Sequence, residues 1–398
     1  MQESSVHTSH ARPPIWRDER VLAIISQIVV VAVVVGLLYF FYNNMVRALR
    51  DQMGIAISFG FIRQTAGFDI GESLIAYQRS DTYGRAFLVG LLNTLQVAAL
   101  GIVLATLVGT IAGIMRLSGN WLVRKIALVY VEFFRNIPLL LLLIFIAQAV
   151  FLKLPRVRDA IRLFDPVFPI FLSNRGIATP WGVPTASWNA YLMALGGGLL
   201  AAIVVAYVQV QRGRRTGRMP FVTLWFLGVF LAIAIVGFII LRPLAYSAPR
   251  LEGLNTEGGK NFSQQFLALL TGLTFYTGAF IAEIVRAGIQ SVSKGQREAS
   301  TALGLNGVQT MRLIVLPQAQ RVIIPPLTSQ YLNLTKNSSL AIAIGYPDLF
   351  AVAGNTILNQ TGRAIEVFMM IMGVYLSFSL LTSLFMNWYN KRIQLVER

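Results

Sequence analysis

Acidic and basic side chains inside long apolar stretches are the residues of this sequence best suited to binding chemistry. Glu283 and Arg286 are three residues apart, as are Glu132 and Arg135, so each acid and its base would share one face of a helix. We expect both to form ion pairs that stabilise helix ends. The alternatives are that Glu283 and Arg286 contact a ligand, and that Arg135 binds a carboxylate through two hydrogen bonds.

A second polar group interrupts an apolar stretch near its middle. Lys336, Ser338 and Ser339 lie within Ile323–Ile344. A lysine at such a depth needs water or a partner, so this group either lines an aqueous cavity or forms hydrogen bonds between helices. Asp348 follows the stretch, and its carboxylate either meets a cationic group or belongs to a hydrated loop.

The sequence contains no recognisable catalytic or metal centre. It has no cysteine, and its two histidines, His7 and His10, are in a polar N-terminal segment, which excludes thiolate and histidine-based metal sites from the body of the protein. It also has no Gly-x-x-x-x-Gly-Lys-Ser/Thr phosphate loop. We therefore expect a protein that is not an enzyme and that holds no metal or cofactor of its own.

The composition indicates a membrane protein. Of 398 residues, 55% are hydrophobic and 13% are charged, against roughly 25% charged in soluble domains. The net charge of +17 suits anionic lipid headgroups, because basic residues collect in cytoplasmic loops of membrane proteins. We prefer this explanation of the positive charge to nucleic-acid binding.

Apolar stretches of about 20 residues, the length that crosses a bilayer as a helix, predict an all-α polytopic membrane protein with about eight transmembrane helices. The predicted spans are Val21–Tyr42, Phe87–Met115, Ile126–Phe151, Tyr191–Val210, Phe221–Leu241, Phe266–Val285, Ile323–Ile344 and Val367–Trp388. The first apolar run is longer than the 7–15 residues of a signal peptide and should remain as an anchor.

The short loops set the predicted orientation. Gln211–Met219 carries four arginines and no acid, and Arg116–Lys125 carries three basic residues and no acid. Basic residues also predominate in the C-terminal tail. With eight spans these segments share one side with both termini, which the positive-inside bias assigns to the cytoplasm.

Polar residues divide the spans into two kinds. Tyr191–Val210 and Phe221–Leu241 have almost none and should face lipid. We therefore expect a core of five helices, one extra N-terminal helix and two inserted helices. The predicted units are a tail (1–20), an extra helix and periplasmic loop (21–85), the first part of the core (86–152), an insertion (153–260), the second part of the core (261–390) and a tail (391–398).

A polar segment, EASTALGLNGVQTMRLIVLP, runs from Glu298 to Pro317 between two apolar stretches. Good helix formers precede Gly304, which can end a helix in the left-handed conformation, and Asn306-Gly307 supplies a turn. The segment predicts a short exposed helix that a partner stabilises, since isolated helices of this length are marginal in water.

This segment resembles the EAA loop by which permeases of ABC importers dock on their ATPase, except that Ser300 replaces an alanine. The residues that the resemblance assigns to ATPase coupling within 294–317 are Gln296, Glu298, Ala299, Ser300, Gly304, Ile314, Leu316 and Pro317. Four further segments resemble those of polar amino-acid (histidine/glutamine-type) permeases, and the layout is similar to the general L-amino-acid permease subgroup. They are Gly90–Leu95, Tyr130–Leu140, Tyr276–Gln296 and Leu334–Leu340.

The resemblance implies a permease subunit in a bacterial inner membrane that imports amino acids. Its implied partners are ATPase subunits that bind ATP and Mg, an identical or related second permease, a periplasmic amino-acid-binding protein and membrane lipid, with no nucleic acid. It implies these substrate-path candidates: Thr94, Pro138, Gln148, Lys336, Ser338, Ser339 and Asp348. The alternative is a secondary transporter driven by an ion gradient, for which we see no internal repeat.

Overall fold

The computed structural model describes residues 19–53, 57–164, 168–217, 221–253 and 255–393. His7, His10 and the outer parts of both predicted tails (1–18 and 394–398) lie outside these residues. Six of the described helices are long and apolar enough to cross a membrane, or seven if one sharply bent pair is a single span. The predicted polytopic helical architecture is confirmed. By length and apolar composition, the described helices give fewer than the eight predicted spans.

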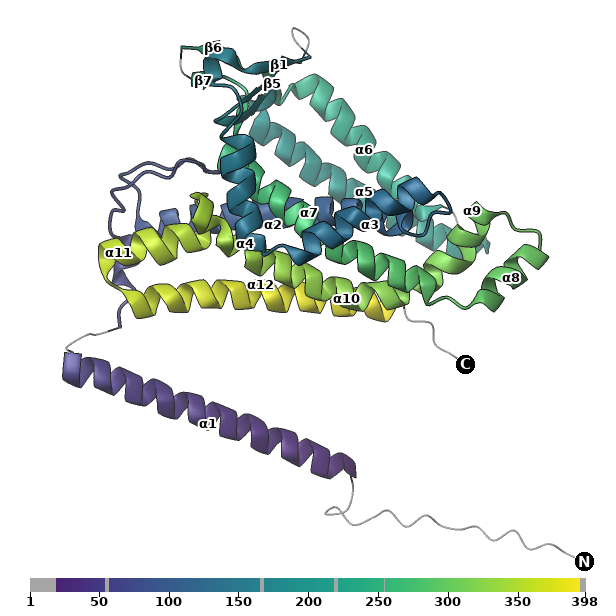
Figure 1. The fold of residues 1–398 in the computed structure, drawn as a ribbon, viewed down its shortest axis with the longest axis horizontal. Coiled ribbons are helices and arrows are strands. Elements are labelled where there is room, and N and C mark those ends of the chain that lie inside the picture. Colours follow the sequence, from purple (N-terminus) through teal and green to yellow (C-terminus); the bar gives the residue numbers. More distant parts are fainter. Residues whose placement is uncertain (1–18, 54–56, 165–167, 218–220, 254, 394–398) are drawn as a thin grey trace, which may run out of the picture.

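Two helices form the centre of the molecule. α2 (Tyr83–Met115) and α7 (Gln264–Gln290) pack together along much of their length (Figure 1). A Cβ atom added at Gly109 would lie 2.6 Å from the Cβ of Ile281 and 2.7 Å from the carbonyl oxygen of Gly278. The two backbones are therefore in near contact, as small residues permit between apolar helices. Small residues recur at every fourth position of α2: Gly101, Ala105, Gly109 and Gly113.

The predicted span Ile126–Phe151 is wrong as a single helix. The chain forms α3 (Trp121–Asn136), α4 (Leu139–Phe145) and η3 (Ile146–Phe151). A bend of 106° separates α3 from the α4–η3 run. Pro138 has no N–H to donate, and it excludes the helical conformation at Ile137, which is extended (φ −98°, ψ 134°).

The predicted span Ile323–Ile344 also needs correction. Helical backbone begins earlier and runs without interruption through three elements: α9 (Gly307–Thr310), η5 (Met311–Val315) and α10 (Leu316–Asn337). The chain then tightens into a 3₁₀ helix, η6 (Ser338–Ile344). α10 is not among the six helices that are apolar enough to cross a membrane, because polar residues recur along it from Gln318 to Lys336.

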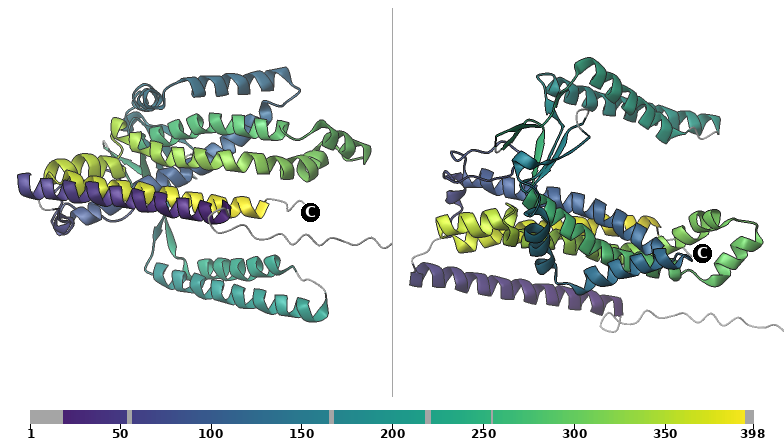
Figure 2. Two further views of the ribbon diagram at one scale, coloured as in Figure 1. Left: turned by 90° about the horizontal axis from the view of Figure 1, so that it is seen from below. Right: turned by 45° about the horizontal axis from the view of Figure 1, so that its top comes forward.

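The inserted helices stand away from the bundle. α5 (Trp188–Thr216) and α6 (Val222–Leu241) pack chiefly against each other, and no residue of α6 is buried (Figure 2). This agrees with their nearly continuous apolar sequence. α1 (Glu19–Met53) likewise lies apart from the other helices, whereas α12 (Ala364–Ile393) packs beside α10 (Figure 1).

Short strands at the root of the inserted helices are the main feature that sequence patterns did not predict. They form a four-stranded antiparallel sheet in the order β1-β2-β3-β8 and two two-stranded sheets, β4-β5 and β6-β7. Strands this short cannot establish a period-two pattern. Their bounds are β1 Ile161–Leu163, β2 Ile170–Ser173, β3 Gly176–Thr179, β4 Trp181–Pro184, β5 Leu244–Ser247, β6 Arg250–Glu252, β7 Asn255–Glu257 and β8 Lys260–Ser263.

The bundle has two distinct ends. The start of α1, the end of α12, the adjoining ends of α5 and α6, and α8 (Lys294–Ala302) lie toward one end, here called the α8 end (Figure 1). The other, the α11 end, carries η7 (Phe350–Ile357), α11 (Leu358–Thr361) and residues 57–82, which include η2 (Gly60–Arg63). The arginine-rich short segments therefore lie at the same end as α8.

Candidate functional site

The exposed loop at the α8 end is held together by one buried serine. Ser300 is 2% exposed and is the buried residue of α8. Its Oγ donates to the carbonyl oxygen of Arg297 at 2.7 Å and forms a hydrogen bond with the Oγ1 of Thr310 on α9 at 2.9 Å. The residue that departs from the EAA pattern therefore connects the two short helices, which an alanine could not do.

The turn between these helices has a defined backbone. Gly304 follows α8 with φ of +75°, a conformation that strains any residue with a Cβ atom. Asn306 then accepts a hydrogen bond from the N–H of Gln309, whose side chain accepts from the N–H of Asn306 in return, both at 2.9 Å. This capping box fixes the start of α9.

Apolar side chains are exposed on this loop. Leu303 is 79% exposed and Val308 is 77% exposed. Of the predicted coupling residues, Gln296, Glu298, Ala299, Gly304 and Pro317 are also exposed or half-buried, as are Ile314 and Leu316. The loop thus offers large apolar side chains to a partner while Ser300 keeps its shape.

The loop is connected to the bundle at both ends. Arg297 donates from Nη2 to the carbonyl oxygen of Ile289 on α7 at 2.7 Å. At the other end the backbone continues through α9 and η5 into α10 as one helical run. A displacement of α8 would therefore be transmitted directly to α7 and α10.

A charged network lies near the α8 end of α7. Arg286 donates from Nε to Glu283 at 3.1 Å, as their spacing predicts, and from Nη1 to Gln290 at 2.6 Å. Glu283 is also paired with Arg116 at the end of α2, which no local pattern indicates because 167 residues separate the two in sequence. Two guanidinium groups thus neutralise one carboxylate and join α2 to α7.

Glu132 and Arg135 share a helical turn but do not pair with each other among the described ion pairs. The side chain and carbonyl oxygen of Glu132 accept hydrogen bonds from Asn136 instead. The guanidinium of Arg135 lies over the ring of Phe280 on α7, 5.5 Å from its centroid, a favourable arrangement for a cation and an aromatic face.

The structure brings together Thr94 and Asp348, which are both fully buried. Asp348 accepts a hydrogen bond from the N–H of Ala351 at 2.8 Å, and Thr94 accepts from the N–H of Leu349 at 2.9 Å. Both side chains therefore satisfy backbone donors at the start of η7. Asp348 is not part of a hydrated loop, since Tyr375 covers its second carboxylate oxygen at 3.5 Å.

The remaining path candidates are of two kinds. Ser338 is buried, and its hydroxyl and that of Ser339 bond to carbonyl oxygens three residues earlier, each at 2.8 Å. Lys336, Pro138 and Gln148 are exposed. Lys336 shares its face of α10 with exposed Ser329 and Asn333, seven and three residues earlier. Such a polar face on a membrane helix requires water or another subunit.

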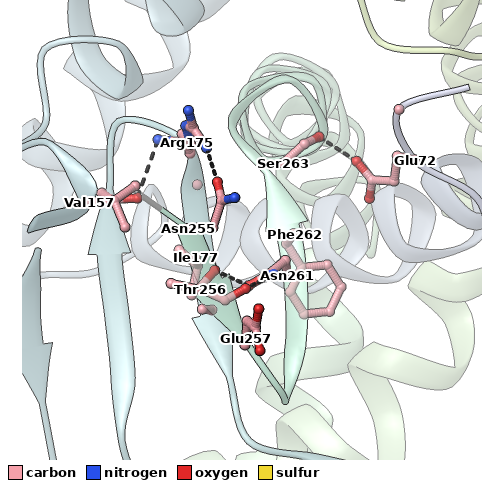
Figure 3. Close-up of a pocket in the computed structure, with 14 residues that line it drawn as sticks. Glu72, Val157, Arg175, Ile177, Asn255, Thr256, Glu257, Asn261, Phe262 and Ser263 are labelled. Carbon is pink, nitrogen blue, oxygen red and sulfur yellow. Dashed lines mark hydrogen bonds between the residues drawn. The ribbon is translucent and has the colours of Figure 1, made fainter. Parts of the chain in front are cut away.

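Sequence patterns did not single out Glu72, which lies between two cavities at the α11 end. The cavities measure about 380 and 400 Å³, and Gly71, Glu72 and Ser263 line both. Ser263 donates its hydroxyl to the Glu72 carboxylate (Figure 3). Asn93 on α2 donates to the carbonyl oxygens of Glu72 and Pro347 at 2.8 and 2.9 Å.

Burial raises the pKa of Glu72, and the hydrogen bond from Ser263 opposes this effect. The segment containing Glu72 is joined to the core by contacts between residues distant in sequence, so no local pattern could identify it. Glu72 lies between Gly71 and Ser73 in a loop, and this local sequence has no spacing that is typical of a binding site.

Comparison with known proteins identifies clear relatives. Residues 194–395 match the family described as binding-protein-dependent transport system inner membrane component. The General L-amino acid transport system permease protein AapQ of Rhizobium johnstonii is 47% identical over 384 residues, 96% of this chain and 94% of the relative.

Two further relatives also match nearly end to end. The Putative amino-acid ABC transporter permease protein YhdX of Escherichia coli is 45% identical and covers 96% of this chain and 97% of its own length. The Glutamate/glutamine/aspartate/asparagine transport system permease protein BztB of Rhodobacter capsulatus is 41% identical and covers 96% of each. The first helix and the insertion are therefore within the shared region.

Proposed function

Because this chain belongs to the family of binding-protein-dependent transport system inner membrane components, we propose that it is the membrane-spanning subunit of an ABC importer for amino acids. The substrate class comes from the names of its relatives. The chain itself supplies a membrane path and a coupling element, and ATP hydrolysis with Mg belongs to a separate ATPase.

One observation carries the mechanism. The exposed α8–α9 loop continues as a single helical run into α10, whose exposed face bears Ser329, Asn333 and Lys336. A force on α8 therefore reaches α9 through the turn at Gly304 and the hydrogen bond between Ser300 and Thr310, and then follows the helical run to the polar face of α10. ATP can favour one state of the permease only through contacts that differ between states, and α8 is where those contacts form.

The α8 end faces the cytoplasm in this proposal. The ATPase would bury Leu303 and Val308, which are otherwise exposed. The basic segments 116–125 and 211–217 lie toward the same end, in agreement with the positive-inside bias. Both termini are then cytoplasmic, and the strands of the insertion lie on the periplasmic side of a bacterial inner membrane.

The translocation path runs along the polar face of α10. A second permease subunit, either a second copy or a related chain, covers this face and completes the path. Lys336 faces the path, with Gln148 and Pro138 as further lining candidates. Thr94, Ser338 and Asp348 are positioning residues, because their polar atoms hold η6 and η7. A periplasmic binding protein delivers the amino acid to the α11 end.

The coupling proposal is tested by Gly304→Val in the complex reconstituted with its ATPase. A β-branched residue at φ of +75° should strain the turn by about 1–3 kcal/mol and displace α8. We expect ATP hydrolysis to continue while amino-acid uptake per ATP falls severalfold.

The matched control is Gly362→Val. Gly362 has φ of +65° and follows α11 at the opposite end of the bundle. A Cβ atom added there would meet no other atom within 4 Å. This variant carries a similar strain and should keep normal coupling. Unchanged uptake per ATP in the Gly304 variant, or equal losses in both variants, would refute coupling through α8.

A further inference from the structure

Two cavities at the α11 end share a wall made by three residues. The first lies between that wall and strands β2, β3, β7 and β8, and the second extends from it to Ile342 and Gly345 at the end of η6. Their volumes, about 380 and 400 Å³, fall within the range of small-molecule sites. The second cavity therefore begins beside Glu72 and ends next to the helix that follows Lys336.

The shared wall carries a carboxylate that no cation contacts directly, and Lys260 acts on it only from beyond ion-pair distance. Among the described residues Glu72 makes no ion pair within 4.0 Å, and its carboxylate accepts a hydrogen bond from the hydroxyl of Ser263. A half-buried carboxylate without a cation in direct contact is electrostatically costly. A ligand ammonium group would supply the missing charge and further hydrogen-bond donors.

The opposite side of the first cavity carries a guanidinium group. Arg175, on the turn before β3, donates from Nη1 to the amide oxygen of Asn255, which orients its side chain (Figure 3). A guanidinium has five N–H donors, so others remain for a ligand carboxylate. Asn261 and Thr256 bond to each other on the floor between Arg175 and Glu72.

We propose that these two cavities form an outer receiving site for a zwitterionic amino acid, in which Glu72 binds the ammonium group and Arg175 the carboxylate. The identification of the ligand as an amino acid rests on the proposed function. Because Glu72 lines both cavities, the ammonium group can stay on it while the rest of the molecule moves from the first cavity into the second. The amino acid then reaches the end of η6 without leaving its charge partner.

The test measures equilibrium binding of radiolabelled L-glutamine to the purified permease–ATPase complex in lipid nanodiscs, without a binding protein. Its comparison ligand is glutaramate, which is glutamine with hydrogen in place of the ammonium group. The wild-type complex should bind glutamine about tenfold or more tightly than glutaramate, since a hydrogen bond to a charged group is lost in the analogue. Equal affinities for the two ligands, or no saturable binding of glutamine, would overturn the proposal.

Three variants separate charge from structure. Glu72→Gln keeps an oxygen that can accept from Ser263 but loses the charge, so glutamine binding should weaken about tenfold and the preference over glutaramate should vanish. Ser263→Ala removes the hydrogen bond to Glu72 and the N-cap of α7 but keeps the charge, so affinity for both ligands should fall while the preference for glutamine persists. Glu252→Gln removes a carboxylate on β6 that lines neither cavity, and binding should match the wild type.

Loss of the glutamine preference in the Ser263 variant as well as in the Glu72 variant would show that Glu72 only attaches the loop to α7, and the proposal would fall. If Glu72→Gln does not assemble, Glu72→Asp retains the charge and should retain the preference. Failure of this site is distinct from failure of the proposed function. A complex that imports amino acids with ATP but lacks the preference contradicts the site alone, whereas a complex with no ATP-driven uptake contradicts the importer.

Discussion

At the scale of single residues, the hydroxyl of Ser300 determines how the proposed coupling loop is held. It joins α8 to α9 from a position that is 2% exposed. Ser300→Ala removes this link and leaves the hydroxyl of Thr310 without that partner, which should cost about 1–2 kcal/mol of local stability. Amide hydrogen exchange across α8 and α9 should therefore speed up by about tenfold.

Thr301→Ala is the matched control for that measurement. The hydroxyl of Thr301 bonds to the carbonyl oxygen of Arg297 within its own helix at 3.0 Å and makes no link to α9. Its removal should leave exchange in α9 unchanged. Equal protection of α9 in the wild type and the Ser300 variant would contradict the role assigned to this serine.

Lys336 is the residue of the path that a single substitution tests best. It is exposed on the polar face of α10, and replacement by methionine keeps most of its length while removing the charge. We expect the Lys336→Met complex to lose at least about threefold in uptake rate, because the path loses a fixed cation. Lys153→Met, an exposed lysine just after η3, should transport normally. Normal uptake and normal assembly in the Lys336 variant would exclude it from the path.

Spacing predicted some residue contacts and could not predict others. The pairing of Glu283 with Arg286 follows from three-residue separation on a helix. The contact of Glu283 with Arg116, and the placement of Glu72 against Ser263, join segments that are distant in the chain. Only the packing of α2, α7 and the 57–82 segment brings those partners together.

At the scale of elements, the α2–α7 contact depends on glycine. Gly109→Leu would place atoms within 2.7 Å of the Gly278 carbonyl oxygen, and backbone cannot move aside as a side chain can. The variant should be destabilised by about 3 kcal/mol or more, toward the upper end of overpacking costs. A sharp fall in monodisperse protein by fluorescence-detected size-exclusion chromatography would show this.

Gly196→Leu provides the comparison, since Gly196 is on α5 and a Cβ atom added there would meet no other atom within 4 Å. It makes the same chemical change in an apolar helix without a backbone neighbour. Its yield should equal that of the wild type. Equal yields for both leucine variants would mean that α2 and α7 do not approach as closely as described.

The helices and strands differ in how accurately the sequence predicts their bounds. α6 and α12 are long and strongly apolar. The predicted bounds of α6 lie within one residue of those observed, and the predicted bounds of α12 lie within five. A bend of 106° at Pro138 divides the predicted span Ile126–Phe151. The strands of the insertion were missed because each contains only three or four residues and depends on pairing with distant segments.

At the scale of the whole molecule, the inserted hairpin is a separable addition to the core. Its helices leave and rejoin the paired strands β4 and β5, where the N–H of Thr185 donates to the carbonyl oxygen of Pro243 at 2.9 Å. Replacing residues 186–242 with a short Gly-Ser linker should keep β4 and β5 paired, since Pro243 has no N–H with which to close a two-residue turn. The shortened protein should unfold within about 3 °C of the full chain, since little of the core is lost.

The measurement for this deletion is thermal unfolding in detergent, followed by the fluorescence of a dye on a cysteine introduced into α7, since the chain has no cysteine of its own. A drop well beyond that range would show that α5 and α6 support the core. Transport by the shortened protein would further indicate that the hairpin acts outside the path. The uniformly apolar sequences of α5 and α6 predict that the hairpin is independent of the core. The strands that anchor the hairpin were identified only in the structure.

The most direct test of the importer mechanism is uptake of radiolabelled L-glutamine by proteoliposomes containing the permease complex, its ATPase and the binding protein. We predict uptake that requires ATP inside, on the ATPase side, and binding protein outside, and that an imposed proton or sodium gradient does not replace. Uptake driven by an ion gradient in the absence of ATP would contradict this mechanism and favour a secondary transporter.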